Sequence, residues 1–225
     1  MSGNVELGSG DCRINEFSDK TIFGILSKFQ SIDEHETINT VQFLRACSDV
    51  TTILDRLGSQ FALPKKDMLG NIKRIEDRYL TDPTLYSSLN AIMEKDSKEG
   101  HKNSSAIIGI IWLKRGLEFL RAFIKGLSRD YHNKVQEENL RTTVLKAYET
   151  TLKPYHGVIS KFLFSNLTRF VPYRKDFLKA LITDPEGTVE TLFIDIDLYL
   201  PNFSDNVDLV ETLLNLHGLN SQETS

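Results

Sequence analysis

Apolar residues recur along this chain with the three-to-four-residue period of an α-helix, and no segment alternates apolar and polar residues as a strand does. The most apolar of these periodic segments is 106–127, and another, interrupted near Pro154, covers 134–155. Polar or proline-containing stretches such as 95–105 and 184–187 interrupt the pattern and read as loops. The sequence therefore predicts an all-α fold of about eight helices.

Glycine, proline and capping residues predict where several helices begin and end. Gly58 would end the second helix, and Pro64 would stand in the first turn of the next one. Thr81-Asp82-Pro83 has the order of a cap followed by a first-turn proline, so a further helix is predicted to start there. Pro201 has no backbone N–H and is predicted to break the final helical stretch.

The length of 225 residues fits one domain, which we expect to span 14–218 between flexible ends at 1–13 and 219–225. Apolar residues make up 40% of the chain and charged residues 26%, as in ordinary globular proteins. The net charge of −4 gives no reason to expect nucleic acid as a partner. A monomer is the simplest expectation.

Cysteine usage and the absence of targeting patterns predict the compartment. Cys12 and Cys47 are too few for a disulfide framework, and Cys47 lies among apolar helical residues, where it reads as a small buried side chain. There is no apolar signal segment at the start and no run of 18 apolar residues. We expect a cytosolic protein that contacts membranes only peripherally.

Catalytic and metal-binding signatures are missing. The chain has no GxGxxG, phosphate-binding loop, GxSxG or HExxH motif, and its histidines have no partners at metal-ligand spacing. The ligand-rich stretch 33–36 is best explained as a solvated loop. We predict no enzyme activity, no metal and no cofactor.

One polar stripe borders an apolar helix face. Asp67, Asn71 and Arg74 are spaced i, i+4 and i+7, so they share one side of a helix. A carboxylate, an amide and a cation in that order can present hydrogen-bonding groups to one ligand. An ordinary solvated helix face would show the same spacing.

Two further places stand out. Trp112, the single tryptophan, precedes Gly116 by one helical turn, and the glycine either leaves space beside the indole or permits close helix packing. His156 follows Pro154 and can donate a hydrogen bond to a ligand carbonyl, although a capping or core histidine would look the same.

These motifs occur together and in a fixed order. The segments DMLGNIKR, WLKRGLEFL, KAYETTLKPYHG and PYRKDFLKAL closely resemble the glycolipid transfer protein family over about residues 17–218. The segments DIDLYLP and LLNLHGL near the end look most like the lipid-transfer domain of the four-phosphate adaptor proteins. We expect no room in this chain for the pleckstrin homology domain of those adaptors.

The resemblance implies a two-layer helical sandwich that binds one glycosphingolipid, with the headgroup at the surface and both chains in an apolar pocket. It implies that Asp67 accepts hydrogen bonds from the ceramide amide and the first sugar, and that Asn71 binds sugar hydroxyls. Trp112 would stack on the first sugar ring, and His156 would bind the acyl carbonyl. Arg74 stands where the family usually has lysine, which keeps a cation but changes its geometry.

The same resemblance assigns apolar residues to two tasks. The hydrocarbon pocket would be lined by Phe119, Phe123, Leu152, Phe164 and Phe177. Membrane docking would rest on Val158, Ile159, Phe162 and Tyr173, with Lys161, Arg169 and Arg174 near lipid headgroups. Family members often carry tryptophan where this chain has Val158, so we hypothesise weaker membrane engagement.

The headgroup class follows from charge. The branch of the superfamily that binds ceramide-1-phosphate places cations at the positions of Asn71, Trp112 and Gly116, and a phosphate needs that charge. An amide, an indole and a glycine predict glycosylceramide transfer instead. The alternatives are ceramide-1-phosphate transfer, a glycolipid sensor or adaptor, and a scaffold with a degenerate pocket. A glycolipid hydrolase would need two flanking carboxylates, and only Asp67 is suitably placed.

Overall fold

The computed structural model describes residues 16–220 of the chain, and within that range the protein is helical with no strand. Two helices of four residues each, α1 (Ile22–Ile25) and α3 (Ile53–Arg56), and three short 3-10 helices connect the longer elements. The 3-10 helices are η1 (Ser59–Phe61), η2 (Lys153–Tyr155) and η3 (Thr168–Phe170). The longer helices are α2 (Thr40–Val50), α4 (Ala62–Thr81), α5 (Leu89–Lys98), α6 (Ser105–His132), α7 (Arg141–Thr150), α8 (Val158–Leu167), α9 (Arg174–Leu181) and α10 (Val189–Leu216).

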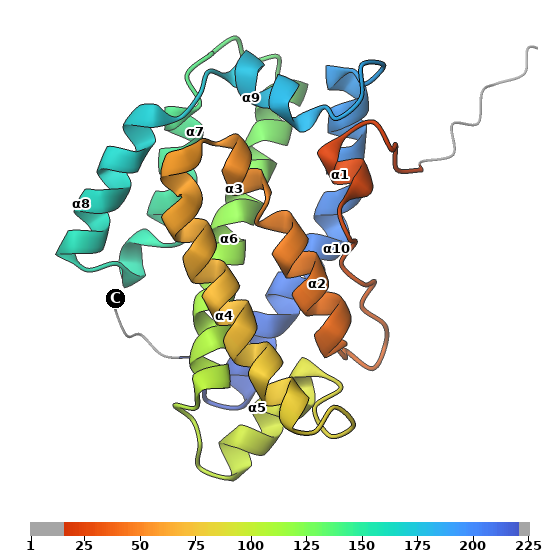
Figure 1. The fold of residues 1–225 in the computed structure, drawn as a ribbon, viewed down its shortest axis with the longest axis vertical. Coiled ribbons are helices and arrows are strands. Elements are labelled where there is room, and N and C mark those ends of the chain that lie inside the picture. Colours follow the sequence, from red (N-terminus) through yellow and green to blue (C-terminus); the bar gives the residue numbers. More distant parts are fainter. Residues whose placement is uncertain (1–15, 221–225) are drawn as a thin grey trace, which may run out of the picture.

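The helices form two layers, as the family resemblance implies. In Figure 1, α2 and α4 lie in front of α6 and α10, and α8 runs along one side of the molecule. The long α6 helix is central, because it packs against α4 of the facing layer and against α10 and α7. The prediction of about eight helices holds for the longer elements, and the one-turn helices α1 and α3 are additional.

Polar caps start several of the helices. The side chains of Asn39, Ser88, Ser104 and Thr188 each accept a hydrogen bond from a backbone N–H in the first turn of the helix that follows. Such caps satisfy N–H groups that have no partner inside the helix and typically contribute about 1 kcal/mol each. Gly58 ends the α3 region in a conformation with φ of 118°, which glycine adopts without strain.

Three predicted boundaries are wrong. No helix starts at 81–83: α4 ends at Thr81, Asp82 accepts a hydrogen bond from the N–H of Leu85 in a turn, and α5 begins after Ser88. The predicted loop 95–105 is helical to Lys98. Ion pairs one turn apart, Lys98 with Glu94 and Lys95 with Glu99, support that polar end of α5.

The third concerns the helix predicted over 134–155, which begins only at Arg141. Lys134 has a φ of 53°, which ends the preceding helical run. The carbonyl of Glu138 then accepts a hydrogen bond from the N–H of Arg174, so this connection is held by a distant segment rather than by helical bonds.

The predicted break at Pro201 is also wrong, because α10 continues through it. Proline removes one helical hydrogen bond and crowds the preceding turn, at a cost of about 3 kcal/mol in an unsupported helix. Here Tyr199 and Phe203, on either side of the proline, are buried in the core. Their packing offsets the local cost, which sequence reasoning could not weigh.

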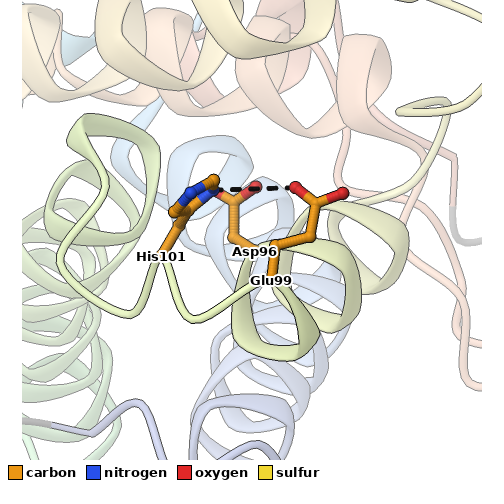
Figure 2. A group of neighbouring side chains, drawn as sticks. All are labelled: Asp96, Glu99 and His101. Carbon is orange, nitrogen blue, oxygen red and sulfur yellow. Dashed lines mark ion pairs between the residues drawn. The ribbon is translucent and has the colours of Figure 1, made fainter.

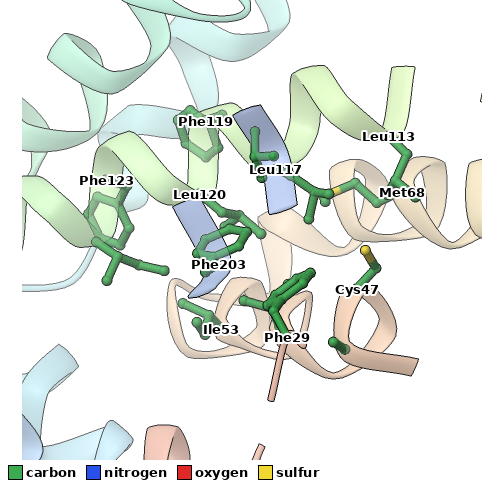
Figure 3. Close-up of a cluster of buried hydrophobic side chains, with 14 of the residues drawn as sticks. Phe29, Cys47, Ile53, Met68, Leu113, Leu117, Phe119, Leu120, Phe123 and Phe203 are labelled. Atoms are coloured by element: carbon green, nitrogen blue, oxygen red, sulfur yellow. The ribbon is translucent and has the colours of Figure 1, made fainter. Parts of the chain in front are cut away.

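The core under α1 and α2 is dense and aromatic. Phe29 stacks on Phe203 with ring centroids 4.8 Å apart, and Tyr199 packs edge-on against Phe23 and Phe29. Figure 3 shows Phe29 beside Phe203, with Phe119 and Phe123 on α6. Cys47 is fully buried in the same core, as predicted.

The packed chain extends to the end of the described range. Leu219 is buried and Asn220 donates a hydrogen bond to Glu211 of α10, so packing reaches two residues past the expected domain boundary at 218. The segment 1–13, together with Cys12, and the last residues, 221–225, lie outside the described residues. No helix within 16–220 is both long enough and apolar enough to cross a bilayer.

Candidate functional site

A cavity of about 590 Å³ opens between α4, α6 and α8. That volume falls within the range of small-molecule sites, roughly 300–1,000 Å³. Its lining is mostly apolar, with polar side chains that include Asp67, Asn71, Arg74 and His156. The apolar and aromatic lining consists of Leu54, Phe61, Leu63, Pro64, Met68, Trp112, Gly116, Phe119, Leu152, Leu163, Phe164 and Leu167.

The polar stripe of α4 is a chain of hydrogen bonds. Arg74 Nη1 donates to Asn71 Oδ1 at 2.9 Å, and Asn71 Nδ2 lies 3.4 Å from Asp67 Oδ2. Asn71 is buried, whereas Asp67 and Arg74 are exposed. These hydrogen bonds fix which way the Asn71 amide points. They leave further acceptor atoms of Asp67 and donor atoms of Arg74 open to a ligand.

Trp112 is held by a buried cation. The guanidinium carbon of Arg115 lies 4.5 Å from the centroid of the Trp112 ring and 3.7 Å from that of Tyr155. Arg115 has no exposed surface. Cation–π contacts strengthen when the cation is removed from water, so this arrangement links the indole on α6 to the η2 segment that precedes His156.

Glycines on α6 let α4 approach closely. A Cβ at Gly116 would lie 3.1 Å from atoms of Met68, and a Cβ at Gly109 would lie 2.9 Å from the carbonyl oxygen of Asn71. The contact with Met68 supports close helix packing at Gly116, and Gly116 also lines the cavity with Trp112, so the structure agrees with both roles considered for it. The two glycines thereby set the distance between the polar stripe and Trp112.

His156 is hydrogen-bonded to Tyr148 of α7. The hydroxyl of Tyr148 lies 3.2 Å from His156 Nδ1, and the Tyr148 ring stacks on Phe164 with centroids 3.7 Å apart. Burial lowers the pKa of His156, and Lys161 and Arg115 lower it further, while Asp67 opposes them by raising it. The imidazole is therefore neutral at pH 7, with one nitrogen available to donate.

The residues expected in the hydrocarbon pocket divide into two groups. Phe119, Leu152 and Phe164 line the cavity, and Phe119 packs edge-on against Phe164 with centroids 5.8 Å apart. Phe123 and Phe177 do not line it. They are fully buried against each other, with centroids 5.5 Å apart.

The side chains expected to dock on membranes are exposed. Val158, Ile159 and Phe162 on α8 keep 85%, 76% and 67% of their surface, and Tyr173 lies past the end of α8, just before α9. Sequence reasoning missed Leu63, Leu163 and Phe170, which are also large and exposed. Arg174 is not free for lipid headgroups, because it is buried and pairs with Asp130 at 3.0 Å.

One group of potential metal ligands lies elsewhere, at the end of α5. Asp96, Glu99 and His101 converge there, with His101 Nδ1 and Glu99 Oε2 3.6 Å apart (Figure 2). Asp96 is fully buried, and its two oxygens already accept hydrogen bonds from Arg78 and from Ser104. This cluster holds the chain at the end of α5, and we assign no metal to it.

The comparisons with known proteins agree with this architecture. A sequence model described as Glycolipid transfer protein (GLTP) matches residues 38–183, which is more than half of the chain. The chain belongs to the glycolipid transfer protein family. It is 33% identical to the glycolipid transfer protein of Danio rerio over 188 residues, covering 81% of this chain and 90% of that protein.

Longer relatives match as well. The chain is 32% identical over 236 residues to the Homo sapiens pleckstrin homology domain-containing family A member 8. The match covers 99% of this chain but 44% of that protein. The chain thus spans less than half the length of that relative. A solved structure of FAPP2, described as selecting simple glycosphingolipids using the GLTP fold, superposes with a TM-score of 0.81. It has 30% identity and covers 91% of this chain and all of that one.

A mouse ceramide-1-phosphate transfer protein superposes with a TM-score of 0.79 at 21% identity, covering 90% of this chain and 99% of that one. At that identity the likeness concerns the fold alone.

Two supporting side chains, Arg115 and Tyr148, were not anticipated from the sequence. Both occur within segments that carry the family resemblance, WLKRGLEFL and KAYETTLKPYHG. Neither spacing nor composition indicates that Arg115 touches Tyr155 or that Tyr148 reaches His156, because each contact joins different elements of the fold.

Proposed function

We propose that this protein binds one glycosphingolipid and carries it between membranes without vesicles, acting on simple glycosylceramides. The observation that carries the proposal is that Asp67, Asn71, Arg74, Trp112 and His156 line the same apolar cavity. Hydroxyls of a sugar need such donors and acceptors, and the C–H face of its ring suits an indole plane. Relatives of this chain are named for glycolipid transfer.

We propose for these side chains the roles that the family resemblance implies. Asp67 accepts from the ceramide amide and the first sugar, and Asn71 and Arg74 bond sugar hydroxyls. Trp112 stacks on the sugar, and His156 donates to the acyl carbonyl. Arg74, through its hydrogen bond to Asn71, also holds that amide in one orientation.

Hydrocarbon chains enter between α4, α6 and α8, where Phe119, Leu152 and Phe164 line the cavity. Each methylene that is kept out of water contributes about 0.8 kcal/mol of transfer free energy. An apolar cavity that takes up the hydrocarbon chains therefore removes most of the barrier to a lipid leaving the bilayer. Phe123 and Phe177 are buried against each other and do not line this cavity, and we propose that they move apart when longer chains enter.

The charge of the cavity favours a neutral sugar headgroup over phosphate. A phosphomonoester carries a charge of about −1.5 to −2 at pH 7. Among the described residues that line the cavity, Arg74 is the only cationic side chain, and it faces the carboxylate of Asp67 through Asn71. Ceramide-1-phosphate transfer is the weaker alternative for this reason.

The protein is proposed to act without catalysis. Glycoside hydrolysis requires a pair of carboxyl groups about 5–10 Å apart. Within the described lining of the cavity, Asp67 is the only carboxylate. A glycolipid sensor or adaptor would use the same binding site, and slow release would distinguish it from a transfer protein.

Membrane contact is proposed to occur through α8 and its surroundings. Exposed apolar patches of this kind on a soluble protein mark interaction surfaces. Val158, Ile159 and Phe162 would enter the bilayer interface, with Tyr173 near its edge. The contact is transient, the protein acts as a monomer, and its location is the cytosol.

The test is transfer of fluorescent galactosylceramide between vesicles by the wild type, Asp67→Val and Trp112→Ala. Asp77→Val is the matched control, because Asp77 lies on α4 but pairs with Lys73 and does not line the cavity. Hydrogen bonds to charged groups contribute about 1.5–3 kcal/mol, so Asp67→Val should weaken lipid binding on the order of 10- to 100-fold. Asp77→Val should transfer normally.

Three results would change the proposal. Binding without transfer would support a sensor. Transfer of ceramide-1-phosphate faster than galactosylceramide would support the phosphate branch. Equal loss in Asp67→Val and Asp77→Val would show that the cavity does not bind the headgroup.

A further inference from the structure

We infer that Tyr148 is a positioning residue for the lipid amide site: its hydroxyl donates a hydrogen bond to Nδ1 of His156 and keeps the imidazole proton on Nε2. This inference rests on the proposed function, in which His156 donates to the acyl carbonyl. Tyr148 comes from α7 and His156 from the segment after η2, so the pair ties two elements together at the cavity.

The direction of the hydrogen bond follows from burial. The Tyr148 side chain is 5% exposed, and within 16–220 the imidazole Nδ1, at 3.2 Å, is the partner found for its hydroxyl. If Nδ1 carried the proton and donated instead, the phenolic hydrogen would be buried without an acceptor. Buried polar hydrogens nearly always have one, so the phenol donates and Nδ1 accepts.

The position of the phenol is fixed by stacking. Its ring lies 3.7 Å from the Phe164 ring at an angle of 9°, and Phe164 in turn packs edge-on against Phe119. Both phenylalanines line the cavity, whereas Tyr148 does not. Tyr148 therefore acts from behind the cavity wall and sets the orientation of His156 rather than touching lipid.

The charged groups around His156 come from three directions. Asp67 faces it from α4, Arg115 from α6 and Lys161 from α8, and burial together with the two cations disfavours the imidazolium. Burial also raises the pKa of Tyr148, which keeps the phenol protonated. A neutral ring with one defined N–H is what a carbonyl acceptor requires.

Nuclear magnetic resonance of the lipid-free protein tests the hydrogen bond directly. The nitrogen signals of His156 are identified as those lost in His156→Gln, at a pH where the imidazole is neutral. We expect an unprotonated Nδ1 and a protonated Nε2 in the wild type. We also expect a change in the Nδ1 signal in Tyr148→Phe, which keeps the ring on Phe164. A proton on Nδ1 of the wild type would overturn the inference.

Lipid binding tests the role. Tyr148→Phe should bind galactosylceramide about three- to tenfold more weakly, the range for one hydrogen bond. Tyr148→Phe and the wild type should bind galactosylsphingosine equally well, because that lipid lacks the acyl carbonyl. Tyr199→Phe is the matched control, because that buried hydroxyl, which has no hydrogen-bond partner within 16–220, lies in the core beside Phe23 and Phe29.

A double-mutant cycle separates positioning from general damage. If Tyr148 acts through His156, adding Tyr148→Phe to His156→Gln should cost nothing further. Additive losses, or equal losses for both lipids, would overturn the inference. A wild type that does not bind galactosylceramide would refute the proposed function and the role of Tyr148 with it. A wild type that binds normally with Nδ1 protonated refutes the inference alone. If Tyr148→Phe fails to fold, the wild-type spectrum still decides.

Discussion

Helices α8 and α10 are both rich in apolar side chains, but α10 buries most of its own against α6 and α1, whereas α8 buries only Phe164. Val158, Ile159 and Phe162 of α8 keep most of their surface exposed. Apolar periodicity looks similar in the two segments, and the difference is one of what covers them. A helix left half uncovered beside a cavity is a candidate for contact with a lipid surface rather than for core stability.

The largest expected effect lies in the α10 core. Phe203→Ala removes a fully buried ring stacked on Phe29 and should lower the free energy of unfolding by about 3–5 kcal/mol. Phe162→Ala on α8 should change it by no more than about 0.5 kcal/mol, since exposed side chains contribute little. Denaturant unfolding of both variants measures this. Similar losses would mean that α8 is covered in solution.

The next effect concerns membrane binding. The double substitution Ile159→Asp and Phe162→Asp should reduce sedimentation with vesicles about tenfold or more, because two apolar side chains no longer leave water. The matched control is Leu216→Asp at the end of α10, which is 73% exposed yet distant in sequence from α8. Equal reduction in the control would show that exposed apolar residues act without regard to position.

A smaller gain is expected from strengthening the same face. Val158→Trp places an aromatic side chain that prefers the membrane interface at the most exposed apolar position of α8. Vesicle binding and transfer rate should rise a few-fold, and the free energy of unfolding should stay within about 0.5 kcal/mol. Unchanged vesicle binding and transfer would contradict the idea that valine weakens docking here.

The smallest effect is a pH dependence of the free energy of unfolding that arises from His156 in the cavity lining. Burial holds the pKa of His156 below its ordinary value, so the unfolded chain takes up the proton more readily than the folded one. Stability from this group is present above the ordinary histidine pKa, about 6.5, and is lost as the pH falls below it. Unfolding at pH 7.5 and 5.5 should show a steeper loss for wild type than for His156→Gln. Identical losses would show that His156 is not the responsible group.

Several parts of this architecture were predictable because they depend on neighbours in sequence. Apolar period and absent strand alternation predicted an all-α chain, and the spacing of Asp67, Asn71 and Arg74 predicted a shared helix face. Their hydrogen bonds along α4 agree with that spacing. The family resemblance extended the prediction to Trp112 and His156, and the cavity brings all of these side chains together.

Other features depended on distant partners. Pro201 was expected to break a helix, and only the burial of its neighbours explains why α10 continues. Arg174 was expected at a membrane surface, and only its pairing with Asp130, remote in the chain, removes it. Phe123 and Phe177 were expected in the pocket, yet they do not line it and pack against each other.

The sequence by itself therefore determined the all-α class, the polar stripe of α4 and the family, since local periodicity and short motifs encode them. Tertiary structure alone decided which apolar faces are covered, that Gly116 packs against Met68, and that Tyr148 backs His156. The physical reason is that burial and hydrogen bonding between separate helices depend on where each helix is placed by the whole core, and no single segment carries that information.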